Sequence, residues 1–417
     1  MAAGRLPGRC GRRRVTTPHP GLRGDPVYLD YNATTPVDPR VVEAMVPYLA
    51  DWFGNPSSGH AYATEPRTAL ARARARVAAL IGADAGEIVF TGSGSEADNL
   101  ALRGVVLAAG NDRPHVITQV TEHPAVLETC RALERLHGAE VTYLPVDRDG
   151  LVDPAVLAAA LTERTVLVSV MAANNETGAL QPVAALARIT RAHGALLHCD
   201  AAQTAGKIPL DVRELGVDLL TVVGHKMYAP KGIAALYVRD GTRLEPLVYG
   251  GGQEHGLRAG TENAALAVAL GKAAQLAEDD LAAGGNHRIA ALRDDLHQRL
   301  AAALPGRVRL NGPREARLPN TLNVSIDHCR GHELLHAVPE VAASTGSACH
   351  SGEHTPSPVL TAMGLPPERA LSALRLSLGR WNTPEEIDTA TRLIGRAAAG
   401  GERDSGPASP GPRERPQ

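Results

Sequence analysis

Short apolar runs alternate with helical stretches up to about Gly260, and this alternation strongly limits the folds open to the chain. The runs of strand length are His115–Gln119, Thr165–Met171, Ala195–Cys199, Asp218–Val223 and Ala234–Val238. Most of them are separated by helical stretches, among them Ala125–Leu136, Asp153–Leu161 and Val183–Ala192. This order predicts a mostly parallel sheet with helices on both faces. Ligands of such sheets bind outside the carboxyl ends of the strands, so we expect the chemistry there.

The pattern changes after Gly260. An Ala/Leu-rich helical region extends to about Leu304, with a break expected at the Gly284–Gly285 pair, and strand candidates follow at Thr321–Ile326 and Ala373–Ser377. We therefore predict an α/β protein with a large domain over residues 27–280 and a smaller α+β domain over 281–400. Residues 1–26, which are basic, are expected to be a disordered extension, with an Arg-rich transit peptide or a nucleic-acid-binding arm as alternatives. Residues 401–417, which are rich in Gly, Pro, Ser and Arg, are expected to be a disordered tail.

The composition excludes several classes of protein. The 43 Lys and Arg nearly balance the 45 Asp and Glu, so no direct nucleic-acid binding is expected. No run of about 18 apolar residues is present, which argues against a membrane-spanning helix. The five cysteines are scattered without a CxxC pair, so we expect a reducing, cytoplasmic compartment. Cys130 and Cys199 fall in a predicted helix and strand and are expected in the core.

Three predicted strands lead into residues that suit a ligand site. The run ALLHC is followed by Asp200, the run DLLTVV by a glycine, His225 and Lys226, and the run EIVF by a Gly/Ser loop containing Gly94 and Ser95. Such a loop at a helix start suits a phosphate, because free backbone N–H groups and the helix dipole point at it. A serine helix cap without any ligand is the alternative interpretation of this loop.

Lys226 and Asp200 sharpen this interpretation when they are taken together. A lysine at a buried strand end is costly unless it is paired or chemically used. Each residue alone also fits a role without any catalysis: Lys226 could be a solvated loop charge, and Asp200 could be a turn residue or a helix cap. A lysine for a Schiff base, an aspartate for a pyridinium nitrogen and a phosphate loop together predict a site for pyridoxal 5'-phosphate (PLP).

The chain also resembles a known family. Matching runs cover about residues 27–397 in order and include YLDYNATTPVDPR (28–40), EIVFTGSGSEADNLA (87–101), TEHPAV (121–126), NNETG (174–178), HCDAAQTAGK (198–207), GHKMYAPKG (224–232), TGSACHSG (345–352) and LRLSLGRWNTPEEID (374–388). They resemble the NifS/IscS-type cysteine desulfurases of the class V aminotransferase family. The resemblance implies a PLP-dependent transferase of fold type I, with a seven-stranded type of sheet in its large domain.

The resemblance implies a role for four residues around the cofactor ring. Lys226 matches the lysine that holds PLP covalently, and Asp200 matches the partner of the ring nitrogen. Gln203 matches the partner of the ring hydroxyl. His123 matches a histidine that stacks on the ring and assists proton transfers.

Further residues match the phosphate contacts of the family. Gly94, Ser95 and His225 match contacts within one subunit, whereas Thr261 matches one supplied by the neighbouring subunit, which implies a homodimer. Val223 departs from the pattern, because it stands where many relatives place a serine hydroxyl near the phosphate. One phosphate contact is therefore expected to be absent or replaced.

The reaction implied by the resemblance is the conversion of L-cysteine to L-alanine. Asn175 and Arg375 match the groups that hold the substrate carboxylate. Cys349 lies in a Ser/Thr/Gly/Pro-rich stretch that reads as a loop, and it matches the family's nucleophile. The sulfur would then pass from Cys349 to an acceptor protein for iron–sulfur cluster assembly, tRNA thiolation or DNA phosphorothioation, and His350 is a candidate for lowering the thiol pKa.

Three other functions are compatible with parts of the sequence. A selenocysteine lyase would share the fold and the cysteine. The run His332-Glu333-Leu334-Leu335-His336 fits the HExxH pattern of zinc proteases, but it leaves the lysine, the aspartate and the phosphate loop unexplained, so no metal is expected. A non-catalytic scaffold would retain the fold without the reaction.

Overall fold

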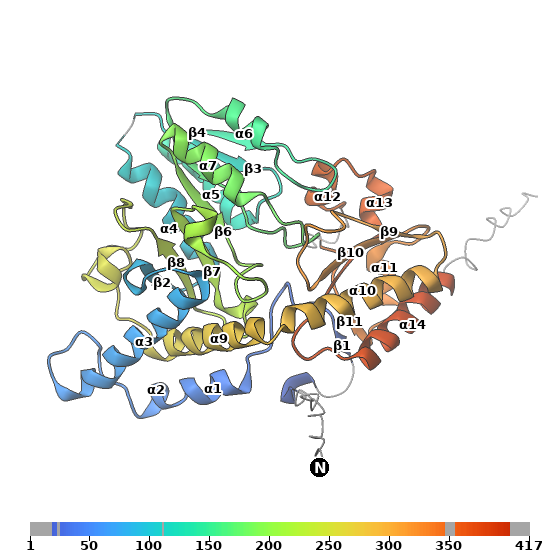
Figure 1. Ribbon diagram of the computed structural model, residues 1–417, viewed down its shortest axis with the longest axis horizontal. Coiled ribbons are helices and arrows are strands. Elements are labelled where there is room, and N and C mark those ends of the chain that lie inside the picture. Colours follow the sequence, from blue (N-terminus) through green and yellow to red (C-terminus); the bar gives the residue numbers. More distant parts are fainter. Residues whose placement is uncertain (1–18, 23–25, 111, 347–354, 401–417) are drawn as a thin grey trace, which may run out of the picture.

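The computed structural model of the chain describes residues 19–22, 26–110, 112–346 and 355–400 (Figure 1). A large sheet with flanking helices occupies one side of the molecule, and a smaller sheet with its own helices occupies the other. Most of the two predicted terminal extensions lies outside the described residues, as do Cys10, Cys349 and His350. None of the helices within the described residues combines the length and apolarity that a bilayer span requires.

The large sheet has seven strands in the order β2-β8-β7-β6-β5-β3-β4. In this order the strands are Ile88–Thr91, Ala234–Val238, Leu219–Val223, Leu196–Asp200, Thr165–Ser169, His115–Gln119 and Glu140–Leu144. The pairs from β7 through β4 are parallel, whereas β8 runs antiparallel to both β2 and β7. The prediction of a mostly parallel seven-stranded sheet is therefore confirmed.

Helices cover both faces of this sheet, because successive strand side chains point to opposite faces. On one face, α4 (Gly94–Ala108) and α5 (Pro124–His137) contribute to a core that includes Val116 and Cys130. On the other face, the core includes Ile117 and Cys199 and takes in side chains of the helices α3 (Thr64–Ile81), α7 (Val183–His193) and α9 (Ala264–Ala282).

Small side chains allow α3 and α9 to approach closely. A Cβ atom on Gly271 would lie only 2.6 Å from the Cα atom of Ala73. The Ala-rich composition of α9 is thus explained by its backbone contact with α3. The remaining short elements of this part are α1 (Pro39–Met45), α2 (Pro47–Ala50), α6 (Pro154–Ala160), α8 (Val212–Leu215) and the 3₁₀ turns η2 (Ala61–Ala63), η3 (Ala85–Glu87), η4 (Gly224–Lys226) and η5 (Gln253–Gly256).

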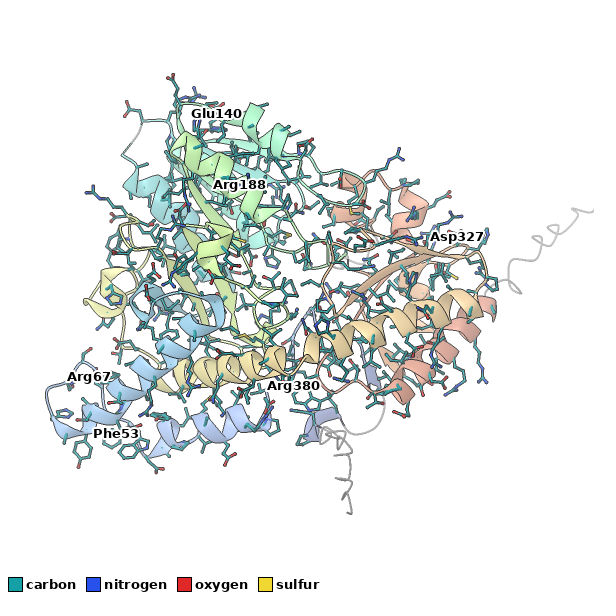
Figure 2. All side chains as sticks on the ribbon, viewed as in Figure 1. Phe53, Arg67, Glu140, Arg188, Asp327 and Arg380 are labelled. Carbon is teal, nitrogen blue, oxygen red and sulfur yellow. The ribbon has the colours of Figure 1, made fainter. Side chains whose placement is uncertain are left out.

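The chain passes to the second part of the molecule through a break between α9 and α10 (Gly285–Ala303). Gly284 has a φ of 73°, a left-handed conformation that glycine adopts without strain, so the predicted break is confirmed. Arg380 lies near this junction (Figure 2) and donates to Asp280 of α9 and to Asp38. This buried guanidinium ties the two parts of the molecule together.

The second part contains a three-stranded antiparallel sheet and a two-stranded parallel one. Their strands are β12 (Ala373–Ser377), β10 (Thr321–Ile326) and β9 (Val308–Leu310), and β1 (Val27–Tyr28) with β11 (Val341–Ala342). The accompanying helices are α10, α11 (Gly331–His336), α12 (Pro358–Ala362), α13 (Pro367–Leu371) and α14 (Pro384–Gly400). Val27 and Leu29 pack in the core of this part, although they precede the large sheet in sequence. The predicted domain boundaries at 27–280 and 281–400 stay a prediction.

Candidate active site

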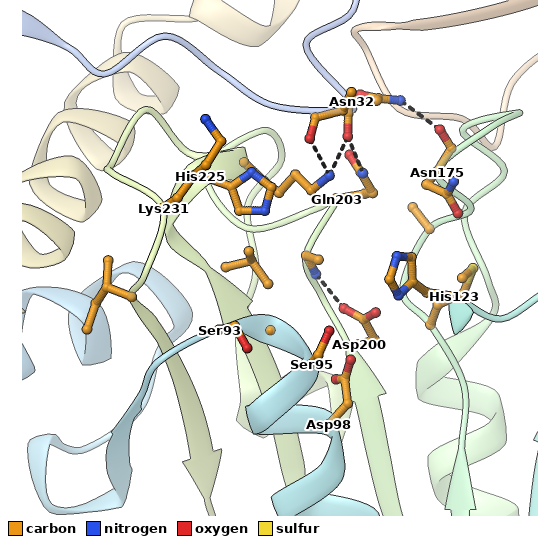
Figure 3. A pocket seen from close by; sticks show the side chains of 18 of the residues that line it. Asn32, Ser93, Ser95, Asp98, His123, Asn175, Asp200, Gln203, His225 and Lys231 are labelled. Carbon is orange, nitrogen blue, oxygen red and sulfur yellow. Dashed lines mark hydrogen bonds between the residues drawn. The ribbon is translucent and has the colours of Figure 1, made fainter. Parts of the chain in front are cut away.

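A cavity of about 430 Å³ lies at the carboxyl ends of the parallel strands, between the two parts of the molecule. It brings together nine of the residues singled out from the sequence: Gly94, Ser95, His123, Asn175, Asp200, Gln203, His225, Lys226 and Arg375. Figure 3 shows Asp200 and His123 beside one another, with Ser93, Ser95 and Asp98 at the N-terminal end of α4. Cys349 lies outside the described residues.

Each strand end delivers its side chain for a local reason. Asp200 is the last residue of β6, and Lys226 lies in the 3₁₀ turn directly after β7. His123 is the N-cap of α5, where its Nδ1 accepts a hydrogen bond from the amide of Ala125 at 3.1 Å. Because these strands are parallel neighbours or near neighbours, their carboxyl ends meet at one edge of the sheet.

Asp200 is a buried carboxylate with a polar environment. Its Oδ1 accepts the amide of Ala202 at 2.8 Å, and only 7% of the residue is exposed. The pKa of Asp200 is raised overall, because burial outweighs the lowering by the Ala202 amide, His123 and Lys226. Burial lowers the pKa of His123, so its ring is neutral at neutral pH. A carboxylate and a neutral ring at the base of the cavity suit a protonated pyridine nitrogen and a flat ring.

Lys226 directs its amine across the cavity. Its Nζ donates to the carbonyl oxygens of Asn32 at 2.6 Å and Ala33 at 2.8 Å. Burial and the charge of Arg375 lower the pKa of Lys226 to about 8, against the opposing charges of Asp200 and Asp30. A substantial fraction of this amine is therefore neutral near pH 8, as a lysine that attacks an aldehyde must be.

The phosphate side of the cavity is the N-terminus of α4. Ser93 caps this helix by accepting the amide of Glu96, and Gly94 and Ser95 form its first turn. A Cβ atom at Gly94 would lie 2.6 Å from Cγ2 of Val223, so only glycine fits beside this valine. Unused amides at the start of a 15-residue helix fit an anion, whereas Val223 presents methyl groups there.

His225 lies on the same side of the cavity. Its Nδ1 is 3.1 Å from Oγ1 of Thr34, and burial, with nearby cations, lowers the pKa of His225 to about 4. The ring is therefore a neutral hydrogen-bonding group. Together with the helix start, the buried carboxylate and the lysine, it makes the donor and acceptor set of this cavity fit PLP.

Arg375 forms the opposite wall from β12. Its Nη2 contacts Oδ1 of Asp30 at 2.8 Å, and its Nη1 is 3.4 Å from the carbonyl of Asn175. The Nε atom is buried and has no hydrogen-bond partner among the described residues. An arginine with an unused donor beside Asn175 suits a small carboxylate ligand.

Sequence reasoning missed Asn32, which connects many of these groups. It is 1% exposed, its amide nitrogen donates to Oγ1 of Thr321 at 2.9 Å and to the carbonyl of Asn175 at 3.1 Å, and its carbonyl accepts from Lys226. Asn32 lies in a run that matched the family, YLDYN, yet no periodicity or strand end marked it. Asp98 is another cavity residue without a predicted role. Its buried Oδ1 has no hydrogen-bond partner among the described residues, and Nε2 of His198 lies 3.7 Å from it.

Thr261 does not line this cavity. It borders a separate cavity of about 260 Å³ with Gly92, Glu254 and Arg258. The predicted contact between Thr261 and a phosphate therefore has no counterpart within one chain, and its origin in a neighbouring subunit stays a prediction.

The HExxH run lies in the second part of the molecule and does not line the cavity. His332, Glu333 and His336 lie on α11, which has six residues. Within the described parts of the chain, no group of three or more His, Cys, Asp or Glu side chains could hold a metal ion. The HExxH pattern is explained as a short surface helix of the second part of the molecule.

Comparison with known proteins identifies the family. The family model "Aminotransferase class-V" matches residues 27–389. Cysteine desulfurase IscS from Anaeromyxobacter sp. (strain Fw109-5) is 49% identical over 372 residues, which cover 88% of this chain and 91% of that protein.

Solved structures agree with this match. A NifS-like protein superposes with a TM-score of 0.83 at 37% identity, over 90% of this chain and 100% of the other. The structure "SspA in complex with cysteine" superposes with a TM-score of 0.75 at 36% identity, over 85% and 99%. The chain therefore belongs to the class-V aminotransferase family, and within it to the NifS/IscS-type cysteine desulfurases, which are PLP-dependent enzymes of fold type I.

Proposed function

We propose that this chain converts L-cysteine to L-alanine and transfers the sulfur to Cys349 as a persulfide, which an acceptor protein then takes up. The observation that carries the proposal is one cavity in which a lysine of lowered pKa, a buried carboxylate and an arginine with an unused donor meet. The similarity to cysteine desulfurases over most of the chain supports the choice of substrate.

The residues that would hold PLP follow from the geometry of the cavity. Lys226 would bind the aldehyde carbon, Asp200 the ring nitrogen, and Gln203 the ring hydroxyl, while His123 would cover the ring. Gly94, Ser95 and His225 would bind the phosphate, joined by Thr261 of a second subunit. When bound, PLP supplies a carbonyl that links to the substrate amine and a ring that accepts electrons from the substrate.

Lys226 would act as the proton carrier of the reaction. Its pKa of about 8 in the protein lies close to neutral pH, which suits an amine that alternately accepts and returns a proton at Nζ. The amine is anchored next to the carbonyls of Asn32 and Ala33, so its position is fixed relative to the cavity.

Arg375 and Asn175 would orient the substrate by its carboxylate. The planar guanidinium offers two parallel N–H donors, and one of its nitrogens, Nε, is unused. Asp30 holds the far side of the guanidinium, which keeps its plane fixed. Lys226 lines the same cavity as this guanidinium.

Cys349 would attack the sulfur of the bound cysteine as a thiolate. A new S–S bond forms while the Cβ–S bond breaks, and the carbon that keeps the electron pair takes up a proton to give alanine. The position of Ser344 supports an attack by Cys349. Ser344 pairs with Arg375, which lines the cavity, through backbone hydrogen bonds at 3.3 and 2.6 Å. Cys349 follows Gly346 by three residues, which span about 10 Å when extended.

A homodimer belongs to the same proposal. Large apolar side chains are exposed around α2 and the segment before α3, including Leu49 at 64%, Phe53 at 71% and Tyr62 at 67%. Figure 2 shows Phe53 at this outer end of the molecule. A second copy would cover such a patch and supply Thr261, so a fully active monomer would contradict this part of the proposal.

The acceptor of the sulfur belongs to the same proposal. A persulfide on Cys349 would supply sulfur to an acceptor protein of iron–sulfur cluster assembly, tRNA thiolation or DNA phosphorothioation. A reducing compartment such as the cytoplasm suits a reactive thiol.

The visible spectrum of the purified protein with PLP tests the proposal, followed by addition of L-cysteine and assay of alanine and sulfide. We expect a coloured protein whose band shifts with L-cysteine, and a Cys349→Ala variant that keeps the colour and loses desulfuration. Cys329→Ala is the matched control and should retain turnover. Faster turnover of L-selenocysteine than of L-cysteine would favour the selenocysteine lyase, and a colourless protein that PLP cannot restore would overturn the proposal.

A further inference from the structure

Lys207 is a second amine near the cavity, and the reaction proposed above leaves it without a role. Its Nζ lies 2.6 Å from Oε1 of Gln203 and 3.3 Å from Oδ1 of Asn32. Both acceptors are amide oxygens, and among the described residues no carboxylate forms an ion pair with Lys207. A lysine that points inward without a counter-charge is costly, so its place requires an explanation.

Local geometry brings Lys207 and Gln203 together. The two residues are four positions apart in a helical turn after β6, in which the amide of Ala205 donates to Ala201 and the amide of Lys207 donates to Thr204, both at 2.9 Å. Residues at this spacing share one face of a helical turn. The amine therefore meets the end of the Gln203 side chain without any large movement of the backbone.

The contact fixes which way the Gln203 amide points. A half-turn about the last side-chain bond of a glutamine exchanges its oxygen and its nitrogen. Lys207 offers only donors, so Oε1 must face it. The Nε2 atom then faces the opposite way, where it donates to the carbonyl of Asn32 at 3.0 Å and has a second hydrogen left.

We propose that Lys207 is a positioning residue that keeps the N–H end of Gln203 turned toward the ring oxygen of PLP. This inference rests on the proposed function, which assigns Gln203 to that oxygen. A donated hydrogen bond stabilises the negatively charged form of the ring oxygen. Without Lys207 only the carbonyl of Asn32 holds the amide in this orientation. The turned orientation, which presents the glutamine oxygen and disfavours that form, then becomes more populated.

The test is a pH titration of the visible band of PLP bound to Lys226, in the full chain and in Lys207→Met. We expect the midpoint of the titration to rise by about one pH unit in the variant, because the anionic form loses its donor. Other charged or titratable groups that face the cavity are the same in both proteins: His123, Asp98, Asp200, His225, Lys231 and Arg375. The dissociation constant of PLP should also rise.

A double-mutant cycle separates action through Gln203 from a direct effect of the charge. If Lys207 acts through Gln203, Lys207→Met adds no further shift in a Gln203→Met background. An equal shift in both backgrounds would show a direct charge effect and overturn the proposal, as would an unchanged midpoint in Lys207→Met. Lys272→Met makes the same substitution on α9, outside the cavity lining, and should leave the midpoint in place.

A second variant of Lys207 and the behaviour of the wild-type protein distinguish a failure of this inference from a failure of the proposed function. Lys207→Ala should show the same rise of the midpoint, and it replaces the methionine variant if that variant does not fold. Wild-type protein without a PLP band, or without desulfuration of cysteine, would refute the proposed function itself. A wild-type band and activity, with unshifted midpoints in both Lys207 variants, would refute only the role of Lys207.

Discussion

The floor of the cavity and its roof are built by different parts of the chain. The floor consists of Asp200, His123 and Ser95, which lie at the end of a strand of one sheet or within four residues beyond it. The roof consists of Asn32, Asn175 and Arg375, which come from loops and from a strand of the second sheet. Figure 3 shows Asn32 and Asn175 on the side of the cavity opposite Ser95 and Asp200. The contact of the Asn32 amide with Oγ of Ser377 spans 345 residues.

The different origins of the floor and the roof suggest different roles in the proposed reaction. The floor depends on the topology of one sheet, so it persists wherever that sheet forms, and in the proposed function it would face the cofactor. The roof exists only when both parts of the molecule are packed together, and in the proposed function it would face the substrate. Substitutions in the floor are therefore expected to change cofactor binding, and substitutions in the roof to change the handling of cysteine.

The largest effect is expected at Lys226, which bridges floor and roof. Lys226→Ala removes the proton carrier and should lower turnover on the order of a thousandfold or more. PLP should still be retained by the phosphate site and Asp200, with an altered spectrum. Turnover assays and spectra of the same sample check this, and a variant within tenfold of wild type would rule out Lys226 as the proton carrier.

A roof substitution should act on the substrate. Arg375→Lys keeps the charge and loses the planar pair of donors, so kcat/KM for L-cysteine should fall roughly 10- to 100-fold. The PLP spectrum without substrate should be unchanged, which is the feature that separates roof from floor. Arg299→Lys on the exposed face of α10 is the control for the chemical change.

Asn32→Ala removes the hub of the roof while leaving its backbone carbonyl in place. The loss of the side-chain contacts with Thr321 and Asn175 should lower kcat/KM about tenfold. Steady-state kinetics and PLP binding together show whether Asn32 belongs to the roof or to the floor. A rise in KM with retained PLP affinity marks a roof residue. A loss of PLP affinity of the same size would mean that Asn32 belongs with the floor.

The rate at which PLP joins the apo-protein should depend on pH through Lys226. Only the neutral amine attacks an aldehyde, and its pKa is about 8, so the rate should rise about fivefold from pH 7 to pH 8 and less than twofold above that. Stopped-flow absorbance measures this directly. Since Arg375 lowers this pKa, Arg375→Met should move the midpoint to higher pH, and an unmoved midpoint would contradict the electrostatic link between roof and floor.

The smallest effect is expected at Val223 in the floor. Val223→Ser would place a hydroxyl beside the helix start that is expected to bind the phosphate, and should tighten PLP binding about threefold. Equilibrium dialysis of PLP checks the change, with Val222→Ser on the same strand as the control for stability. Weaker binding in Val223→Ser would show that the valine methyl groups are needed beside Gly94.

The two regions also differ in how well the sequence predicts them. Strands such as His115–Gln119 and Ala234–Val238 were predicted at their observed bounds, because apolar runs between helices report burial in a sheet. Asp200 and Lys226 followed from the strand ends. Asn32 has no such signal, because its partner Thr321 lies on a distant segment of the chain. Lys207 has none either, because a hydrogen bond to the polar side chain of Gln203 leaves no periodic pattern in the sequence. Cys349 was proposed from the resemblance alone.

Transfer of sulfur from cysteine to Cys349 is tested by peptide mass spectrometry after a single turnover without reductant. We expect one added sulfur atom on the peptide that contains Cys349 and none on the peptides that contain Cys130, Cys199 or Cys329. The added sulfur should be absent from Lys226→Ala. Sulfur on Cys329 instead, or alanine formed with no sulfur on any cysteine, would rule out Cys349 as the sulfur acceptor.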